Sequence, residues 1–182
     1  MEISVTIGDI LDEAADLMVS TANTHLNMSG GVNGAILQRG GESVQAELRA
    51  HLRTEGRDWV EPGTVVTTQP GPLDVQAIIH AVGIDGFYES SIELVCQTIQ
   101  RVLSQASRRG GGVVAMPAIA TGYGPLTARE FATALGKAVV GDEYPGITNL
   151  KIVLRRRRAA LEVAEELERL GIVPRVNLPD EI

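Results

Sequence analysis

The feature that most constrains the fold is a short apolar segment that leads, through a glycine loop, into a helix. The run Leu17-Met18-Val19 is followed by Ser20-Thr21-Ala22-Asn23, and a loop with Gly30 and Gly31 precedes a helix-forming segment from Ala35. Such loops let backbone N–H groups approach an anion closely, and the helix end adds partial positive charge. Asn23 stands at the exit of the expected strand, where ligands of open α/β sheets bind.

A second segment repeats this arrangement. Residues 113–116 are an apolar run typical of a buried strand, and the loop 118–124 that follows contains two glycines. Thr127 and Glu130 then have the spacing of a capping box, which predicts a helix to about Val140. Either loop alone is compatible with an ordinary strand-to-helix turn. If their strands are neighbours, the two loops face each other and could clamp a diphosphate between backbone amides.

Strand and helix patterns alternate along the rest of the chain. We predict strands at 3–7, 63–68, 75–82 and 150–154, and a helix at 157–170. A helix from Ala35 to about Leu52 is interrupted at Gly40-Gly41, and another, capped by Ser90 or Ser91, runs to about Ser107. This alternation predicts an α/β sandwich with a parallel or mixed sheet. We expect one domain over residues 1–174 and a loosely held C-terminal tail at 175–182.

Composition restricts the function classes. The chain is 44% hydrophobic and 21% charged, as in ordinary soluble globular proteins, and the 3% aromatic content leaves the core to aliphatic residues. A net charge of −7 argues against a domain that binds a nucleic-acid backbone. The single cysteine, Cys96, excludes an internal disulfide, and His25, His51 and His80 lack metal-ligand spacing. We expect no signal peptide, membrane span, metal or membrane partner, and we expect a cytoplasmic location.

Five motifs in order resemble those of macrodomains, which are ADP-ribose-binding modules. They are Gly8-Asp9-Ile10, Ser20-Thr21-Ala22-Asn23, Gly30-Gly31-Val32, Ile78-Ile79-His80-Ala81-Val82-Gly83 and Pro117-Ala118-Ile119-Ala120-Thr121-Gly122. Together they fall within residues 3–154, most of the chain. The resemblance implies a three-layer α/β/α sandwich with a central mixed, largely parallel sheet. It also implies ADP-ribose or an ADP-ribosylated protein as partner, with no cofactor.

The resemblance assigns roles to individual residues. Asp9 matches the acceptor of the adenine amino group, Ile10 the residue whose backbone lies beside adenine, and Asn23 the asparagine that reaches the distal ribose. Without the family, Asp9 is a common turn or N-cap residue, and Asn23 could brace its loop. The expected phosphate-contacting residues are Gly30, Gly31 and Val32 on the first loop, and Ala118, Ile119, Ala120, Thr121, Gly122 and Tyr123 on the second.

Three departures from the family bear on catalysis. Asn33 stands where the best-known hydrolytic members have an aspartate, Ser20 replaces an asparagine, and the second loop is one residue shorter. An amide cannot act as a general base, so a factor of about 10²–10⁴ in rate is lost. We take Asn23 and Asn33 as the candidate catalytic residues, although Asn33 could only position a water.

Two functions therefore compete. The first is an ADP-ribose reader or sensor with weak or no turnover. The alternative is a hydrolase that removes ADP-ribose from mono-ADP-ribosylated protein, or that processes ADP-ribose-1″-phosphate or O-acetyl-ADP-ribose.

Four further residues invite a functional interpretation. His80 lies within an apolar run and is better explained as a hydrogen-bonded core histidine. Arg155 follows the last expected strand, where its guanidinium could stack on the adenine. Asp85 and Glu89 follow the His80 strand and could approach the site, but two solvated loop acids are the favoured interpretation.

Overall fold

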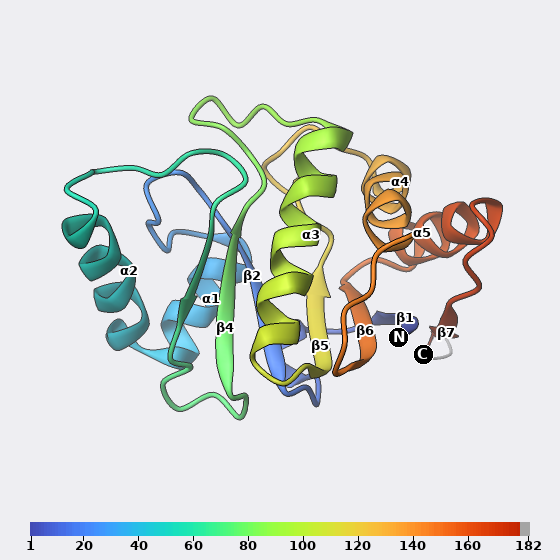
Figure 1. The fold of residues 1–182 in the computed structure, drawn as a ribbon, viewed down its shortest axis with the longest axis horizontal. Helices are drawn as coiled ribbons and strands as arrows, with labels where there is room; N and C mark the ends of the chain where they lie inside the picture. Colours follow the sequence, from blue (N-terminus) through green and yellow to red (C-terminus); the bar gives the residue numbers. More distant parts are fainter. Residues whose placement is uncertain (179–182) are drawn as a thin grey trace.

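The computed structural model describes residues 1–178 as a seven-stranded sheet with helices on both faces (Figure 1). The strands are β1 (Glu2–Ile7), β2 (Leu17–Ala22), β3 (Val65–Thr68), β4 (Ala77–Val82), β5 (Gly112–Pro117), β6 (Ile147–Leu154) and β7 (Arg175–Asn177). The helices are the 3-10 turn η1 (Ile10–Asp12), α1 (Gly31–Gly40), α2 (Glu42–Thr54), α3 (Ile92–Arg108), α4 (Ala128–Val139) and α5 (Arg157–Arg169). The strand order is β3-β4-β2-β5-β6-β1-β7, and β3 is antiparallel to β4 while the other pairs are parallel. The predicted three-layer sandwich with a mixed, largely parallel sheet is confirmed.

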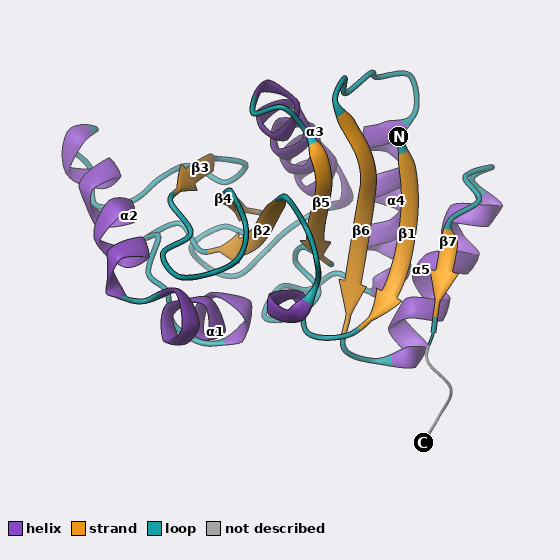
Figure 2. Ribbon diagram, turned by 90° about the horizontal axis from the view of Figure 1, so that it is seen from below, coloured by secondary structure: helices purple, strands orange, loops and turns teal. Residues whose placement is uncertain are grey.

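Alternate residues of the strands build two separate cores. On β2, Leu17 and Val19 pack into a core shared with α3, α4 and α5. Met18 and Ala22 face the other way, into a core shared with α1 and α2. Figure 2 shows α4 behind β6 and β1, and α5 behind β7. Because the central strands are covered on both faces, they read as nearly continuous apolar runs.

Glycines set the start of α1 and the break after it. The helix begins at Gly31, four residues before the predicted start, and its first bond joins the Gly34 amide to the Gly30 carbonyl. Glycine is a poor helix former, but the first turn needs no intrahelical donors, so loop glycines can enter the helix. The predicted interruption is confirmed at Gly41, whose φ of 84° separates α1 from α2.

The predicted helix caps are confirmed, and the structure decides between Ser90 and Ser91 as the cap of α3. Thr127 and Glu130 form the capping box at the start of α4. Ser91 caps α3 by accepting from the Leu94 amide, whereas Ser90 donates to the Gly83 carbonyl. Both loops that precede these helices are thereby fixed at their helical ends.

The segment after residue 174 differs from the expected loose tail. Arg175–Asn177 form β7, which pairs in parallel with β1 over Ser4–Thr6. The three residues are too few and too polar to be recognised as a strand in the sequence, and the open edge of β1 supplies their backbone partners. Residues 179–182 of the expected tail lie outside the described residues. Within residues 1–178, no helix is long and apolar enough to span a membrane.

Candidate functional site

Strained backbone marks one edge of the sheet. Within the described part of the chain, three non-glycine residues have a positive φ: Leu26 at 51°, Tyr88 at 65° and Ala120 at 62°. They lie in the loops after β2, β4 and β5, which are parallel neighbours, so all three loops meet at the carboxyl edge of the sheet. Strain of this kind costs stability and gathers at binding and catalytic sites. This edge is therefore the candidate functional site.

The two glycine loops lie in contact at the centre of this edge. Their strands, β2 and β5, are paired, with Leu17 opposite Val114. The side chain of Tyr123 reaches across from the second loop to the first: a β-carbon built on Gly30 would lie 2.8 Å from the tyrosine hydroxyl, and one built on Gly31 3.7 Å from its ring. The two glycine loops therefore face each other, as the diphosphate hypothesis requires.

Both glycines of the first loop have conformations that favour glycine. Gly30 has a φ of 69° and Gly31 a φ of 55°. Side chains here would meet Tyr123 as well as backbone strain. The loop therefore presents bare backbone towards Tyr123, as a site for anion binding by backbone amides requires.

The second loop is a compact turn. The Thr121 hydroxyl donates to the Ala118 carbonyl over 2.8 Å, and the Leu126 amide donates to the Ala120 carbonyl over 3.1 Å. A β-carbon on Gly124 would stand 2.5 Å from the Ala120 carbonyl oxygen, so the turn closes only with glycine there. Ile119 and Ala120 are buried beneath the turn, while Gly122 and Tyr123 are exposed at its tip.

Asn23 braces the first loop. Its side-chain nitrogen donates to the Asn27 carbonyl over 2.9 Å, and its side-chain oxygen accepts from the Asn27 amide over 3.1 Å. The bracing role considered for this residue is confirmed, and its contact with a ribose stays a prediction.

Asn33 is buried in the first turn of α1. Its side-chain oxygen accepts a 2.5 Å hydrogen bond from the Ser20 hydroxyl on β2, and Asn33 is only 5% exposed. One of the two lone pairs of this oxygen is thus in use, and the other could still accept from a water.

Asp9 lies at the opposite end of this edge, at the exit of β1. One carboxylate oxygen caps η1 by accepting from the Leu11 amide over 3.1 Å, which confirms the N-cap interpretation. The other oxygen accepts from the Arg155 guanidinium over 2.9 Å. Ile10 is buried directly after Asp9. The exit of β6 thus brings Arg155, 66% exposed, beside the residue expected to meet adenine.

His80 is a core residue, as predicted. It is fully buried on β4 and its Nε2 lies 3.0 Å from the Thr68 hydroxyl. Burial lowers the pKa of His80 to about 4, so the ring is neutral near pH 7. Its Nδ1 has no hydrogen-bond partner in the described structure.

Asp85 is not a free acid at the site. Its carboxylate accepts from the backbone amides of Phe87 and Glu89, each over 2.8 Å, and so holds the loop after β4. Glu89 is exposed.

The loop after β4 also brings to this edge a contact that the sequence did not reveal. The rings of Tyr88 and Tyr123 meet edge to face, with centroids 6.3 Å apart. The low aromatic content of the chain was the one sequence signal for this contact. In a chain with so few aromatic residues, an aromatic side chain in a loop is unusual and indicates a role at the surface.

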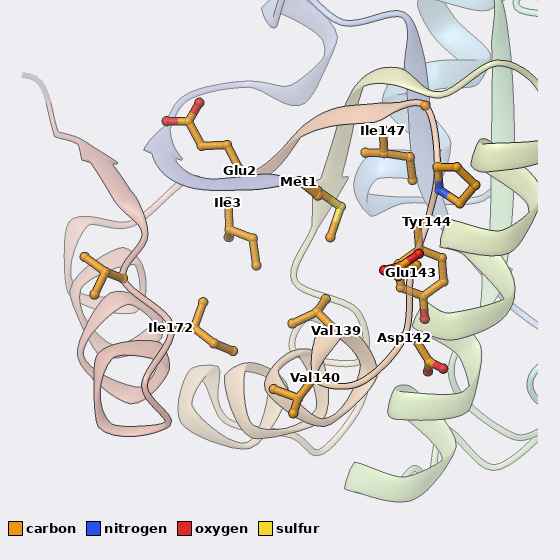
Figure 3. Close-up of a pocket in the computed structure, with 13 residues that line it drawn as sticks. Met1, Glu2, Ile3, Val139, Val140, Asp142, Glu143, Tyr144, Ile147 and Ile172 are labelled. Atoms are coloured by element: carbon orange, nitrogen blue, oxygen red, sulfur yellow. The ribbon is translucent and has the colours of Figure 1, made fainter.

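A hollow of about 620 Å³ lies away from this edge (Figure 3). It is lined by the starts of β1 and β6 and the end of α4, with Ile3 and Ile172 on one side and Asp142 and Glu143 on the other. It contains none of the predicted site residues. No group of three or more histidine, cysteine, aspartate or glutamate residues within 1–178 could hold a metal ion.

The sequence model of the Macro domain family matches residues 19–135, well over half of the chain. The chain belongs to the macrodomain family. A macro domain-containing protein of Streptomyces griseus is 33% identical over 165 residues, covering 88% of this chain and 91% of that protein. An O-acetyl-ADP-ribose deacetylase of Cronobacter turicensis is 35% identical over 125 residues, covering 67% of this chain and 70% of that enzyme.

Solved macrodomains share this architecture. A mutant of the Oceanobacillus iheyensis macrodomain with ADPR superposes with a TM-score of 0.80 at 26% identity, covering 92% of both chains. The same macrodomain with ADP gives a TM-score of 0.79 at 25% identity, covering 91% of this chain and 89% of that one.

Proposed function

We propose that this macrodomain binds ADP-ribose or an ADP-ribose derivative between the loops after β2 and β5, as a reader or sensor with weak or no turnover. The observation that carries the proposal is the contact of the two loops through Tyr123, at the edge where three strained loops meet. The ADP-ribose and ADP complexes of the Oceanobacillus iheyensis macrodomain support the same ligand class.

We propose a direction for the ligand that is consistent with the strand order. Asp9 follows β1, the second glycine loop follows β5 and the first follows β2, in that order across the sheet. With adenine at Asp9 and Ile10, the diphosphate meets Gly30–Val32 and Ala118–Tyr123, and the distal ribose lies towards Asn23. The Asp9 oxygen that accepts from Arg155 has a second lone pair for the adenine amino group. The Arg155 guanidinium is then close enough to the base end to stack on it.

Asn33 favours binding over hydrolysis. An amide cannot take a proton from an attacking water, so general-base help is missing at this position. The alternative is hydrolysis of ADP-ribosylated protein, ADP-ribose-1″-phosphate or O-acetyl-ADP-ribose, and the deacetylase relative is the observation that favours it. Product release from a mono-ADP-ribosylated protein separates the two.

A reducing compartment such as the cytoplasm suits this chain. Its single cysteine, Cys96, is buried, and burial raises the pKa of the thiol, so the reactive thiolate is disfavoured. We propose ADP-ribose-bearing proteins of that compartment as partners.

Thermal unfolding with added ligand tests the proposal. A ligand that binds the folded state at a hundred times its Kd stabilises it by about 2.7 kcal/mol, which raises the melting temperature by several degrees. ADP-ribose should produce this shift, and ribose-5-phosphate at equal concentration should not. Equal shifts with both would mean that the adenine and diphosphate are not recognised.

A further inference from the structure

Exposed aromatic rings gather at the site although aromatics are scarce. The chain has one tryptophan, three tyrosines and two phenylalanines. Four of these six rings are exposed, and we call them the aromatic rim: Trp59 at 45%, Phe87 at 87%, Tyr88 at 52% and Tyr123 at 71%. No other aromatic among residues 1–178 is exposed, so the rim uses most of the aromatic surface of the chain.

Contacts with Thr24, the residue after Asn23, bring the rim loops together. The Val60 amide, next to Trp59, donates to the Thr24 carbonyl over 2.8 Å. A β-carbon on Gly86, next to Phe87, would lie 3.9 Å from the Thr24 hydroxyl. The edge-to-face pair of Tyr88 and Tyr123 joins the loop after β4 to the second glycine loop. Figure 1 shows the loop between α2 and β3, in teal, and the loop between β4 and α3, in green, at the same end of the sheet.

The loop after β4 is built to hold its rings outward. Asp85 accepts from two backbone amides of the loop, and Ser90 donates to the Gly83 carbonyl over 2.5 Å. Tyr88 is held with a φ of 65°, which strains a residue with a bulky side chain. The strain in this loop and the exposure of Phe87 both cost folding stability. Phe87 adds nothing to the core in return, because its side chain is almost fully exposed. Its shape therefore points to a partner outside the chain.

The sheet order says which part of a ligand meets the rim. The site runs from Asp9 after β1, past the loops of β5 and β2, and the next strand is β4. A ligand laid along it ends with its distal ribose near Asn23 and points its C1″ substituent towards Phe87 and Tyr88. In free ADP-ribose this substituent is a hydroxyl group. In an ADP-ribosylated protein it is the modified side chain, so the rim lies where the protein would emerge.

The charge of the rim loops selects the chemistry of that protein. Residues 57–61 and 84–90 carry Asp58, Glu61, Asp85 and Glu89 against a single Arg57. Exposed tryptophan and tyrosine are the residue types that anchor protein interfaces. An acidic surface attracts a basic segment and repels a polyanion such as a nucleic acid.

We infer that the aromatic rim docks the basic protein segment that carries the ADP-ribose, so that the domain distinguishes ADP-ribosylated protein from free ADP-ribose. This inference rests on the proposed ADP-ribose site. Phe87 and Trp59 select the carrier, while the glycine loops hold the nucleotide.

Three probes test the rim. They are free ADP-ribose, a lysine-flanked serine peptide joined through C1″ to ADP-ribose by a stable linkage, and the same conjugate flanked by glutamates. Affinities are measured by competition for the wild type, Phe87→Ser and the control Val173→Ser, whose side chain is 83% exposed at another surface. Trp59 is the only tryptophan, so its fluorescence reports directly on the rim.

The lysine-flanked conjugate should bind about tenfold more tightly than free ADP-ribose. A gain of this size is what one or two aromatic anchor residues contribute to a protein interface. Phe87→Ser should remove this gain and change free ADP-ribose affinity by less than about twofold, while Val173→Ser keeps the gain. Trp59 emission should shift with this conjugate and stay constant with free ADP-ribose.

Equal affinity for free ADP-ribose and both conjugates overturns the rim inference and leaves the proposed function standing. Tighter binding of the glutamate-flanked conjugate than of the lysine-flanked one overturns it as well. Binding of none of the probes overturns the proposed function and the rim inference together.

Discussion

The hydroxyl of Ser20, in the middle of the buried strand β2, donates a 2.5 Å hydrogen bond to the side-chain oxygen of Asn33 in the first turn of α1. Ser20 is fully buried and Asn33 nearly so. The core thus fixes the side chain at position 33, where hydrolytic relatives are expected to place a carboxylate. The same serine could hold a carboxylate in the same place.

Asn33→Asp should therefore add hydrolysis without loss of fold. The Ser20 hydroxyl can donate to either side-chain oxygen, and the other oxygen of the new carboxylate could assist an attacking water. Product release from a mono-ADP-ribosylated protein should rise by about 10²–10⁴-fold. Equally slow release of ADP-ribose by the wild type and the variant would show that the site lacks other catalytic groups besides a general base.

Asp9→Asn should weaken ADP-ribose binding by about 1–3 kcal/mol, because the new amide faces the adenine amino group with a donor. The asparagine oxygen can still cap η1, so melting temperature is the control for folding. The hypoxanthine analogue, inosine diphosphate ribose, presents an acceptor and should lose less affinity in the variant. Equal losses for both nucleotides by calorimetry would remove Asp9 from the base site.

Gly31→Glu should abolish nucleotide binding, because the side chain would enter the space between the glycine loops and bring negative charge to the phosphates. Gly41→Glu is the matched control: Gly41 also has a positive φ, 84° against 55°, but lies between α1 and α2 with open space around it. Both variants add strain and one charge, and only Gly31→Glu should lose ADP-ribose affinity. Retained affinity in Gly31→Glu contradicts the phosphate placement.

Stability should fall as the pH is lowered below neutral. Burial lowers the pKa of His80 from 6.5 to about 4, so between these values the unfolded chain binds more protons than the folded one. The unfolding free energy should then drop by about 2 kcal/mol from pH 7 to pH 5. Urea denaturation at the two pH values measures the drop, and His80→Gln should reduce it. An unchanged drop in the variant would assign the effect to other groups.

Local signals predicted the elements that frame the site. The two glycine loops, the break at Gly41 and the Thr127 capping box all depend on residues close together in the sequence, where conformational preferences act directly. The pairing of β2 with β5 was only a condition of the sequence argument, and the structure supplies it.

Contacts between distant residues could not be predicted. Arg155 and Asp9 are 146 residues apart, and the sequence does not show that β6 lies beside β1. The contact of Tyr88 with Tyr123 depends on β4 and β5 flanking β2, and β7 depends on the open edge of β1. Each of these is set by tertiary packing, which decides the side-chain pairs of the site.

The most direct test of the ADP-ribose site is a calorimetric titration of the protein with ADP-ribose, AMP and ADP. The proposed site assigns adenine, diphosphate and distal ribose to the loops after β1, β5 and β2, so we predict that ADP-ribose binds with a Kd near micromolar, more tightly than either control. Binding no tighter than that of ADP would mean that the distal ribose is not held. No heat at several temperatures, with no thermal shift, would contradict the account.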